Sequence, residues 1–65
     1  MRRTYQVGDR VQDGLGHWYE ISRLILTAEG FVVGYWVQAL TPIGTPAELR
    51  PIGTQVRMWP YEIRR

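Results

Sequence analysis

Side chains able to carry out acid–base or nucleophilic chemistry are scarce in this chain of 65 residues. It has one histidine, His17, and one serine, Ser22, and it has neither cysteine nor lysine. A metal site needs three or four ligands, and His17 has no partner at a ligand spacing. On an extended strand His17 and Ser22 point to opposite faces unless a bulge intervenes, so they do not form a nucleophile–base pair. The sequence therefore predicts neither a catalytic residue nor a metal site.

The carboxylates are scattered along the chain rather than paired. Their spacing does not indicate that burial raises the pKa of one acid relative to another, as general acid–base catalysis requires. Asp9 is expected to accept a hydrogen bond from a neighbouring backbone amide. Four other acids are interpreted as solvated charges: Asp13, Glu20, Glu29 and Glu62.

The aromatic residues are more informative than the titratable ones. Two adjacent pairs, Trp18–Tyr19 and Tyr35–Trp36, fall within predicted strands, where neighbouring residues point to opposite faces. The apolar phase of these strands places the tyrosines in the core and the tryptophans outside it. If the strands are sequential antiparallel neighbours, one outer surface contains Trp18, Trp36, Arg57 and Trp59.

Exposed tryptophan and arginine together have the composition of an interaction site. Aromatic rings and guanidinium groups also stack on nucleic-acid bases. The alternative is that loops fold over these rings and form a second small core. All basic residues are arginines, and the net charge is +2. Four of them are expected to form a basic rim if the chain ends lie together, or two solvated ends if they do not: Arg2, Arg3, Arg64 and Arg65.

These residues must be positioned by β-strands, because apolar residues alternate with polar ones and no helix of ordinary length is predicted. The pattern predicts strands at 7–11, 17–27, 31–40, 54–59 and 63–65. A shift of the apolar phase predicts a β-bulge near Ser22–Arg23, and 27–30 is expected to form a tight hairpin turn. Val7 and Val11 are expected to point to one face of the first strand. The expected core face of the third strand contains Phe31, Val33, Tyr35, Val37 and Ala39.

The segment 41–53 contains three prolines and two glycines, so no strand can cross it. The tetrapeptide Pro-Ile-Gly-Thr occurs twice, at 42–45 and 51–54, and each copy is typical of a bend. Between the bends, Thr45 is expected to cap one helical turn, with Glu48 reaching back to complete a capping box. The segment is therefore predicted to be a structured loop within a single domain, residues 1–65.

A chain this short buries only a small core, and such domains often gain stability by forming oligomers. The absence of cysteine is typical of a cytoplasmic protein. No stretch is long and apolar enough to span a membrane, and the N-terminal residues lack the apolar region of a signal peptide. We expect a cytoplasmic homo-oligomer that binds neither metal nor membrane.

The order of the predicted elements resembles the SH3-like small barrel. "VGDRV" at 7–11 is similar to the opening strand of KOW- and Tudor-like domains of this kind. "MWPYEI" at 58–63 is similar to the short turn between their last two strands. The resemblance implies an all-β fold, an SH3-like five-stranded small barrel with one short helical turn in the 41–53 loop.

A narrower resemblance is to the plasmid-borne, trimethoprim-insensitive type II dihydrofolate reductases. "GDRV" at 8–11, Trp18, "TAEGFVV" at 27–33 and "VRMWP" at 56–60 follow that family in order. In the family's pore motif, Val-Gln-Ile-Tyr-Pro, this chain has arginine, methionine and tryptophan at the three central positions, and it lacks the lysine of the pore mouth. The resemblance implies a homotetramer around one central pore that binds NADPH and dihydrofolate.

The leading hypothesis is a non-catalytic binding module without a cofactor. Its tryptophan and arginine surface would bind nucleic acid or a protein partner, including another copy of itself. The alternative is an NADPH-dependent reductase, in which Arg57 attracts the phosphates of the dinucleotide or the folate tail and Trp59 stacks on a ring. A third hypothesis is a self-assembling structural subunit with its contact at the 41–53 loop.

Overall fold

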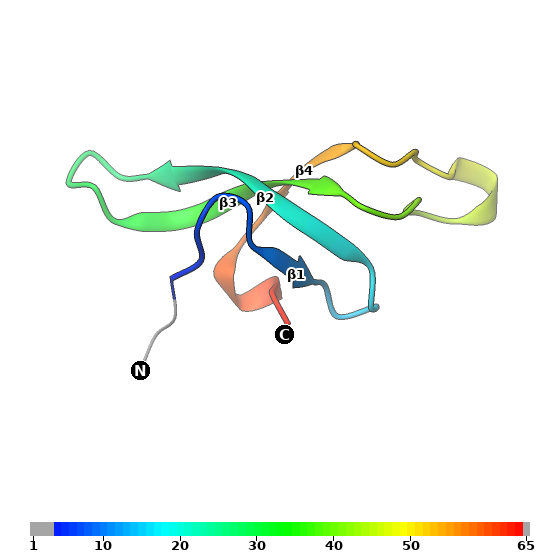
Figure 1. Ribbon diagram of the computed structural model, residues 1–65, viewed down its shortest axis with the longest axis horizontal. Coiled ribbons are helices and arrows are strands. Elements are labelled where there is room, and N and C mark those ends of the chain that lie inside the picture. The colour runs from blue at the N-terminus through cyan, green and yellow to red at the C-terminus, as the bar shows by residue number, and fades with distance from the viewer. Residues whose placement is uncertain (1–3, 65) are drawn as a thin grey trace.

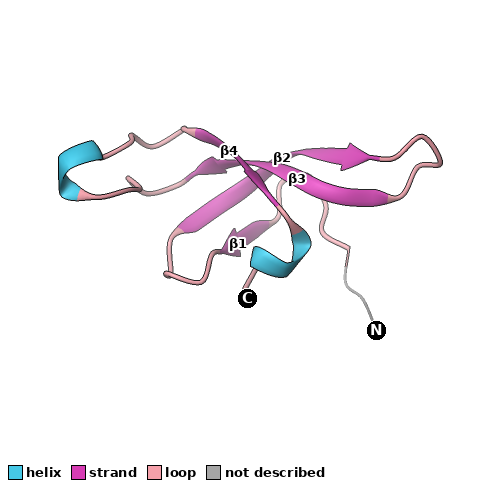
Figure 2. Ribbon diagram, turned by 180° about the vertical axis from the view of Figure 1, so that it is seen from behind, coloured by secondary structure: helices cyan, strands magenta, loops and turns pink. Residues whose placement is uncertain are grey.

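The fold is a single antiparallel sheet of four strands in the order β1-β2-β3-β4. The computed structural model describes residues 4–64. In that range the strands are β1 (Arg10–Gln12), β2 (Trp18–Leu26), β3 (Val32–Ala39) and β4 (Gln55–Met58) (Figure 1). Two short 3-10 helices, η1 (Pro46–Glu48) and η2 (Pro60–Glu62), are the only helices among the described residues (Figure 2). The predicted all-β class is confirmed.

The sheet is open, and the predicted closed barrel of five strands is not observed. In place of a fifth strand at 63–65, Arg64 forms a single bridge to Gln12. The two residues exchange backbone N–H to carbonyl hydrogen bonds of 2.9 and 2.7 Å. The chain leaves η2 only at Ile63, so just one residue of the described part can pair with β1. The remainder of the predicted fifth strand, Arg65, lies outside the described residues.

A β-bulge bends the long strand β2, as its apolar phase predicts. The register with β3 shifts between Ile21 and Arg23, leaving Ser22 without a partner residue in β3. The Ser22 hydroxyl donates to the carbonyl of Trp36 at 3.0 Å, which ties the bulge to the neighbouring strand. The bulge moves Arg23 into the row of residues opposite Trp36.

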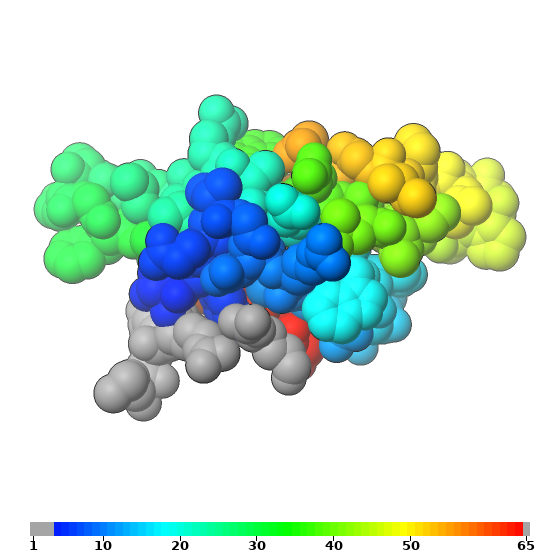
Figure 3. Space-filling model, in the orientation of Figure 1, coloured from blue at the N-terminus to red at the C-terminus, as the bar shows by residue number. Residues whose placement is uncertain are grey.

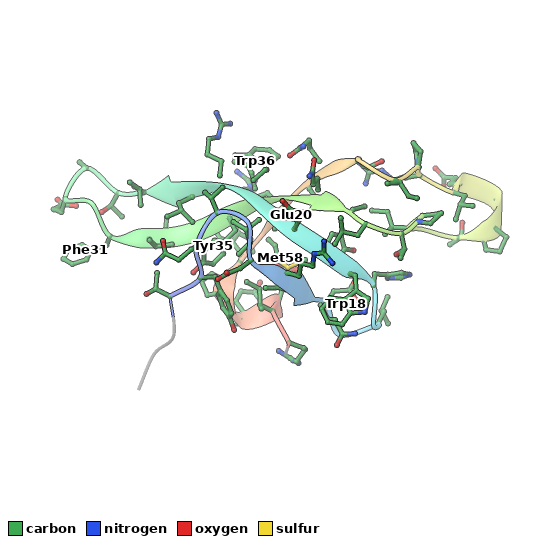
Figure 4. The ribbon with its side chains drawn as sticks, viewed as in Figure 1. Trp18, Glu20, Phe31, Tyr35, Trp36 and Met58 are labelled. Atoms are coloured by element: carbon green, nitrogen blue, oxygen red, sulfur yellow. The ribbon has the colours of Figure 1, made fainter. Side chains whose placement is uncertain are left out.

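The core lies on one face of the sheet. Tyr35 is at its centre and is 2% exposed, with the Tyr5 ring edge-on to it at 5.8 Å between centroids. Figure 4 shows Tyr35 and Met58 on this side and Trp36 on the other. We call the face that carries Trp36 the outer face. The buried residues are Val11, Tyr19, Ile21, Tyr35, Val37, Ala39, Ile43, Met58 and Ile63.

Two residues predicted for the core, and one predicted for the first strand, are exposed outside those positions. Val7 lies in a turn before β1, where the Asp9 amide donates to the Gln6 carbonyl, so the first strand begins only at Arg10. Phe31 lies at the far end of the β2–β3 hairpin, which projects from the rest of the molecule (Figure 3). Val33 has no partner in β2, because the register shifts a second time between Ile25 and Leu26, and Val32 packs against the core in its place. Period-two alternation identifies the face of a strand, but it does not show where the covering layer ends.

The 41–53 segment forms the second projection of the molecule, opposite the hairpin (Figure 3). Ile43 and Arg50 form an isolated bridge across it, and η1 lies at its tip. The Thr45 hydroxyl accepts a hydrogen bond from the Glu48 amide at 3.2 Å, which confirms the predicted cap and helical turn. The Glu48 side chain does not return to the Thr45 amide, so the predicted capping box is not completed. Gly44 has a φ of +103°, and a Cβ there would be 2.6 Å from the Glu48 carbonyl oxygen.

Candidate nucleic-acid interface

A row of three side chains crosses the outer face of the sheet. In the register, Arg23 of β2 is opposite Trp36 of β3, and Trp36 is opposite Arg57 of β4. Directly opposed residues of antiparallel strands lie on the same face, so the Trp36 indole is flanked by a guanidinium group on each side. Trp36 is half-buried, and both arginines are exposed.

Trp59 extends this row along the sheet. Its ring lies over Gly34, where an added methyl group would be 3.0 Å from Trp59 Cε3. The same point is 3.5 Å from Ile25 Cδ1, so the indole and the Ile25 side chain both border the space above Gly34. The Arg57 guanidinium carbon is 5.1 Å from the Trp59 ring centroid, a cation–π distance. A glycine inside a strand often marks a bend, whereas the role of Gly34 here is to make room for an aromatic ring.

The arginines of this surface are not paired with an acid in the part of the chain that the structure describes. Among residues 4–64, no salt bridge reaches Arg23 or Arg57. Trp59 is 36% exposed, so its ring packs on the sheet and still reaches solvent. We define the Trp36 surface as Arg23, Trp36, Arg57 and Trp59. It combines two cations with two aromatic rings on one face of the sheet.

Arg23 is the member of this surface that sequence reasoning did not single out. On an unbroken strand, Ser22 would share a face with Glu20 and Arg23 would point into the core. The predicted bulge was the signal that could have revealed it, because one extra residue reverses the facing of every residue after it.

Trp18 does not join the Trp36 surface. It is 43% exposed, but its cross-strand partner is Gln12, and Figure 4 shows it well separated from Trp36. It lines a concavity of about 340 Å³ together with Arg10, Leu40 and Thr41. Trp18 is the first residue of β2 and pairs with β1, whereas Trp36 is in the middle of β3, so the predicted surface of four residues divides into a group of three and a separate Trp18.

The predicted basic rim is represented by Arg64 alone. Its guanidinium donates to the carbonyls of Tyr61 and Ile63 at 2.9 and 3.3 Å, and it lies beside the β1–β2 turn, close to Asp13. Arg64 therefore does not border the Trp36 surface. The other three members, Arg2, Arg3 and Arg65, lie outside the described residues.

His17 belongs to a hydrogen-bonded turn centred on Asp13. The Asp13 carboxylate accepts hydrogen bonds from the Leu15 amide, the His17 amide and the Tyr19 hydroxyl at 2.8, 3.0 and 2.9 Å. His17 Nδ1 lies 3.1 Å from the same carboxylate. Asp13 was predicted to be a solvated charge, and it is instead the acceptor that holds the β1–β2 turn together.

The pKa values of Asp13 and Tyr19 are shifted by their contacts. Burial acts to raise the pKa of Asp13, but hydrogen bonds from the His17 backbone, Tyr19 and the Leu15 backbone outweigh burial and lower it below the usual value. Burial, the hydrogen bond to Asp13 and the charge of that carboxylate raise the pKa of Tyr19 to about 12. The two shifts have one shared cause, the hydrogen bond between the phenol and the carboxylate.

Comparison with protein-family models, curated proteins and solved structures finds no match to this chain. In the part of the chain that the structure describes, no three His, Cys, Asp or Glu side chains are grouped so as to hold a metal ion. No helix within residues 4–64 has the length and apolar character needed to cross a membrane. A function for this chain must therefore be inferred from the geometry of the Trp36 surface.

Proposed function

We propose that this chain is a non-catalytic binding module whose Trp36 surface binds single-stranded nucleic acid. The observation that carries the proposal is the row Arg23–Trp36–Arg57, in which an indole lies between two exposed guanidinium groups that form no salt bridge within residues 4–64. Each base has an aromatic face that can stack on an indole, and phosphates lie at the edges where the arginines are placed. No cofactor is needed for this function.

Two contributions to the binding free energy are expected, base stacking on the indole rings and contacts between arginine and phosphate. Stacking of one base on an aromatic side chain contributes about 1–3 kcal/mol. Phosphate contacts release counterions, so the logarithm of the affinity falls linearly as the logarithm of the salt concentration rises. A surface with only a few arginines predicts a modest affinity and a shallow slope. Base specificity is not expected, because the Trp36 surface presents rings and guanidinium groups rather than amides.

The test is binding of labelled single-stranded DNA and RNA oligonucleotides, measured by fluorescence anisotropy over a salt series. We expect Arg57→Ala to weaken binding. It should also reduce the slope of log affinity against log salt concentration by about one, which corresponds to the loss of one phosphate contact. Arg50→Ala is the matched control, because it removes the same charge from an exposed position on the 41–53 loop. Equal effects of the two variants, or an affinity that does not respond to salt, would reject the proposal and favour a protein ligand for this surface.

We further propose that the fold is of the SH3-like type. The meander order of the four strands, the 3-10 turn η2 and the return of Arg64 to β1 support this assignment. Amide hydrogen exchange tests it, because a fifth strand would protect the amide of Arg64 as strongly as the amides of β1. Rapid exchange at Arg64 would indicate an open sheet of another type.

The reductase activity remains a second candidate because of one observation. Arg57 is exposed on β4 with its guanidinium against the Trp59 ring, the two positions that the resemblance assigns to ligand binding. The test is oxidation of NADPH in the presence of dihydrofolate by the purified protein, together with its mass in solution. A protein that stays monomeric has no pore and cannot act in this way.

A further inference from the structure

Strand β4 forms an unpaired edge of the sheet. It pairs with β3 on one side, and within residues 4–64 no strand lies on the other. The Ala39 amide donates to the Thr54 carbonyl, and hydrogen bonding alternates from residue to residue in an antiparallel pair. The backbone groups of Val56 and Met58 therefore face β3, whereas those of Gln55 and Arg57 face away from the sheet.

Both ends of this edge are closed by local hydrogen bonds. At one end the Glu62 carboxylate accepts from the Trp59 amide at 2.8 Å. At the other end the Thr54 amide donates to the Pro51 carbonyl, and the Gly53 amide donates to the Ala39 carbonyl. The free edge is therefore limited to Gln55 and Arg57, each with one donor and one acceptor. An open edge of this kind is a template for pairing with another strand.

We propose that two copies of this chain pair through β4, antiparallel, about a two-fold axis at Val56. Gln55 of one copy then faces Arg57 of the partner subunit, and the same pair recurs on the other side of the axis. Each such pair exchanges two backbone hydrogen bonds, so all four donors and all four acceptors of the two edges are satisfied. The proposed dimer uses the backbone edge of β4, whereas the Trp36 surface uses side chains on the outer face, so Arg57 takes part in both. The pairing itself does not depend on nucleic-acid binding.

The neighbouring two-fold registers satisfy fewer groups. An axis at Arg57 places the two guanidinium groups directly opposite each other, and like charges in this position are unfavourable. It also pairs Gln55 with Trp59, whose amide is already hydrogen-bonded to Glu62. An axis at Gln55 pairs Arg57 with Gly53, whose amide is already bound to Ala39. The local caps at the two ends of β4 thus select the axis at Val56.

The side chains agree with this register. On the core side, Val56 is half-buried and packs against the core cluster, and the pairing places it against Val56 of the partner subunit. On the outer face, Gln55 is opposite the partner's Arg57, so a neutral amide rather than a second cation faces each guanidinium. The result is a continuous sheet of eight strands with both Trp36 surfaces on one side.

The absence of native cysteine makes the register directly testable. Val56→Cys introduces the only thiol of the chain at the symmetry axis. Opposed residues of a non-hydrogen-bonded pair have Cα atoms about 4.5 Å apart, which lies within the range of a disulfide. We expect this variant to form a disulfide-linked dimer under mild oxidation, as measured by non-reducing electrophoresis and mass spectrometry. Gln55→Cys is the matched control, because Gln55 does not face its own copy.

Sedimentation equilibrium of the unmodified protein provides an independent measurement. We expect a dimer at high protein concentration and its loss in Gln55→Pro, which removes an edge donor that has no partner within the described residues. Gln55→Ala keeps this donor and should stay dimeric, and circular dichroism checks that each variant is folded. A wild-type protein that is monomeric at millimolar concentration, or equal crosslinking of the two cysteine variants, overturns the proposal.

Discussion

At the scale of single residues, the Asp13 carboxylate holds the β1–β2 turn together through several hydrogen bonds. It receives three hydrogen bonds from the β1–β2 turn and from Tyr19, and it lies 3.1 Å from the His17 ring. A carboxylate that accepts several hydrogen bonds is favoured in its charged form, which explains why its pKa is lowered despite burial. The cluster combines an acid, an imidazole and a phenol, but its geometry is that of a turn.

Asp13→Asn is predicted to destabilise the protein by about 1–3 kcal/mol at neutral pH, because the turn amides and the Tyr19 hydroxyl lose a charged acceptor. The folded pKa of Asp13 lies below its unfolded value of 3.8, so its contribution is present above that pH and is lost as the pH falls through the folded pKa. Urea unfolding from neutral to acidic pH should therefore show a steeper loss for the wild type than for the variant. If the unfolding free energies of the two proteins fall equally with decreasing pH, Asp13 does not stabilise the turn as a charged acceptor.

Tyr19→Phe is the companion variant and tests the same hydrogen bond from the other side. The folded pKa of Tyr19, about 12, lies above its unfolded value of 10.0. Its contribution is therefore present below pH 10 and is lost as the pH rises toward 12. We expect the alkaline loss of stability to be smaller in the phenylalanine variant, as measured by the same unfolding experiment. If the two proteins lose the same stability at alkaline pH, Tyr19 does not titrate in this way.

At the scale of elements, the bulge in β2 and the glycine in β3 together create the Trp36 surface. The bulge at Ser22 moves Arg23 to the outer face, and Gly34 leaves space for the Trp59 ring. Neither residue touches a ligand in the proposed function, but both position the side chains that do. A site on a sheet can depend on backbone irregularities as much as on the exposed groups themselves.

Gly34→Ala is predicted to displace the Trp59 ring, because the new methyl group would be 3.0 Å from Cε3 and 3.1 Å from Cζ3. Overpacking of this kind costs about 1–3 kcal/mol. The measurements are tryptophan fluorescence, unfolding free energy and oligonucleotide affinity, all of which should change.

Gly14→Ala is the control for that substitution, because a Cβ at Gly14 has nothing within 4 Å and its backbone needs no positive φ. This variant should leave the fluorescence spectrum and the affinity unchanged. Equal behaviour of the two alanine variants would show that Trp59 does not pack on Gly34 in solution.

At the scale of the whole molecule, a small core carries two long projections. The molecule measures 41 × 22 × 17 Å, and the hairpin and the 41–53 loop extend from opposite sides of the core (Figure 1). Both projections expose large apolar side chains, among them Phe31, Leu49 and Ile52. A domain of this size has little hydrophobic stabilisation to spare, which is the physical reason to expect it to associate with another copy.

The proposed β4 pairing has a thermodynamic consequence at this scale. Because only folded chains can form the dimer, the melting temperature should rise with protein concentration. We expect this rise for the wild type and for Gln55→Ala, and a melting temperature independent of concentration for Gln55→Pro. Differential scanning calorimetry over a wide range of protein concentration measures it, and a wild-type melting temperature that does not change with concentration would contradict the dimer.

Local sequence patterns determined the features that depend on neighbouring residues. These include the all-β class, the bulge near Ser22, the hairpin turn at Gly30, the cap at Thr45, and the inward facing of Tyr19 and Tyr35. Each of them follows from side-chain alternation or from the backbone preferences of glycine, proline and threonine. The same patterns failed for Val7, which lies in a turn, for Phe31, which lies beyond the core, and for Val33, where a second register shift places Val32 against the core instead.

Only the tertiary structure decided which outward-facing side chains meet. Trp18 and Trp36 have the same local pattern, yet strand register places Trp18 beside β1 and Trp36 in the middle of β3, where Arg23 and Arg57 flank it. The open edge at β4 is also a tertiary property, because it depends on which strand ends without a neighbour and on the caps from Pro51 and Glu62. The physical reason is that residues distant in sequence become neighbours only through strand pairing.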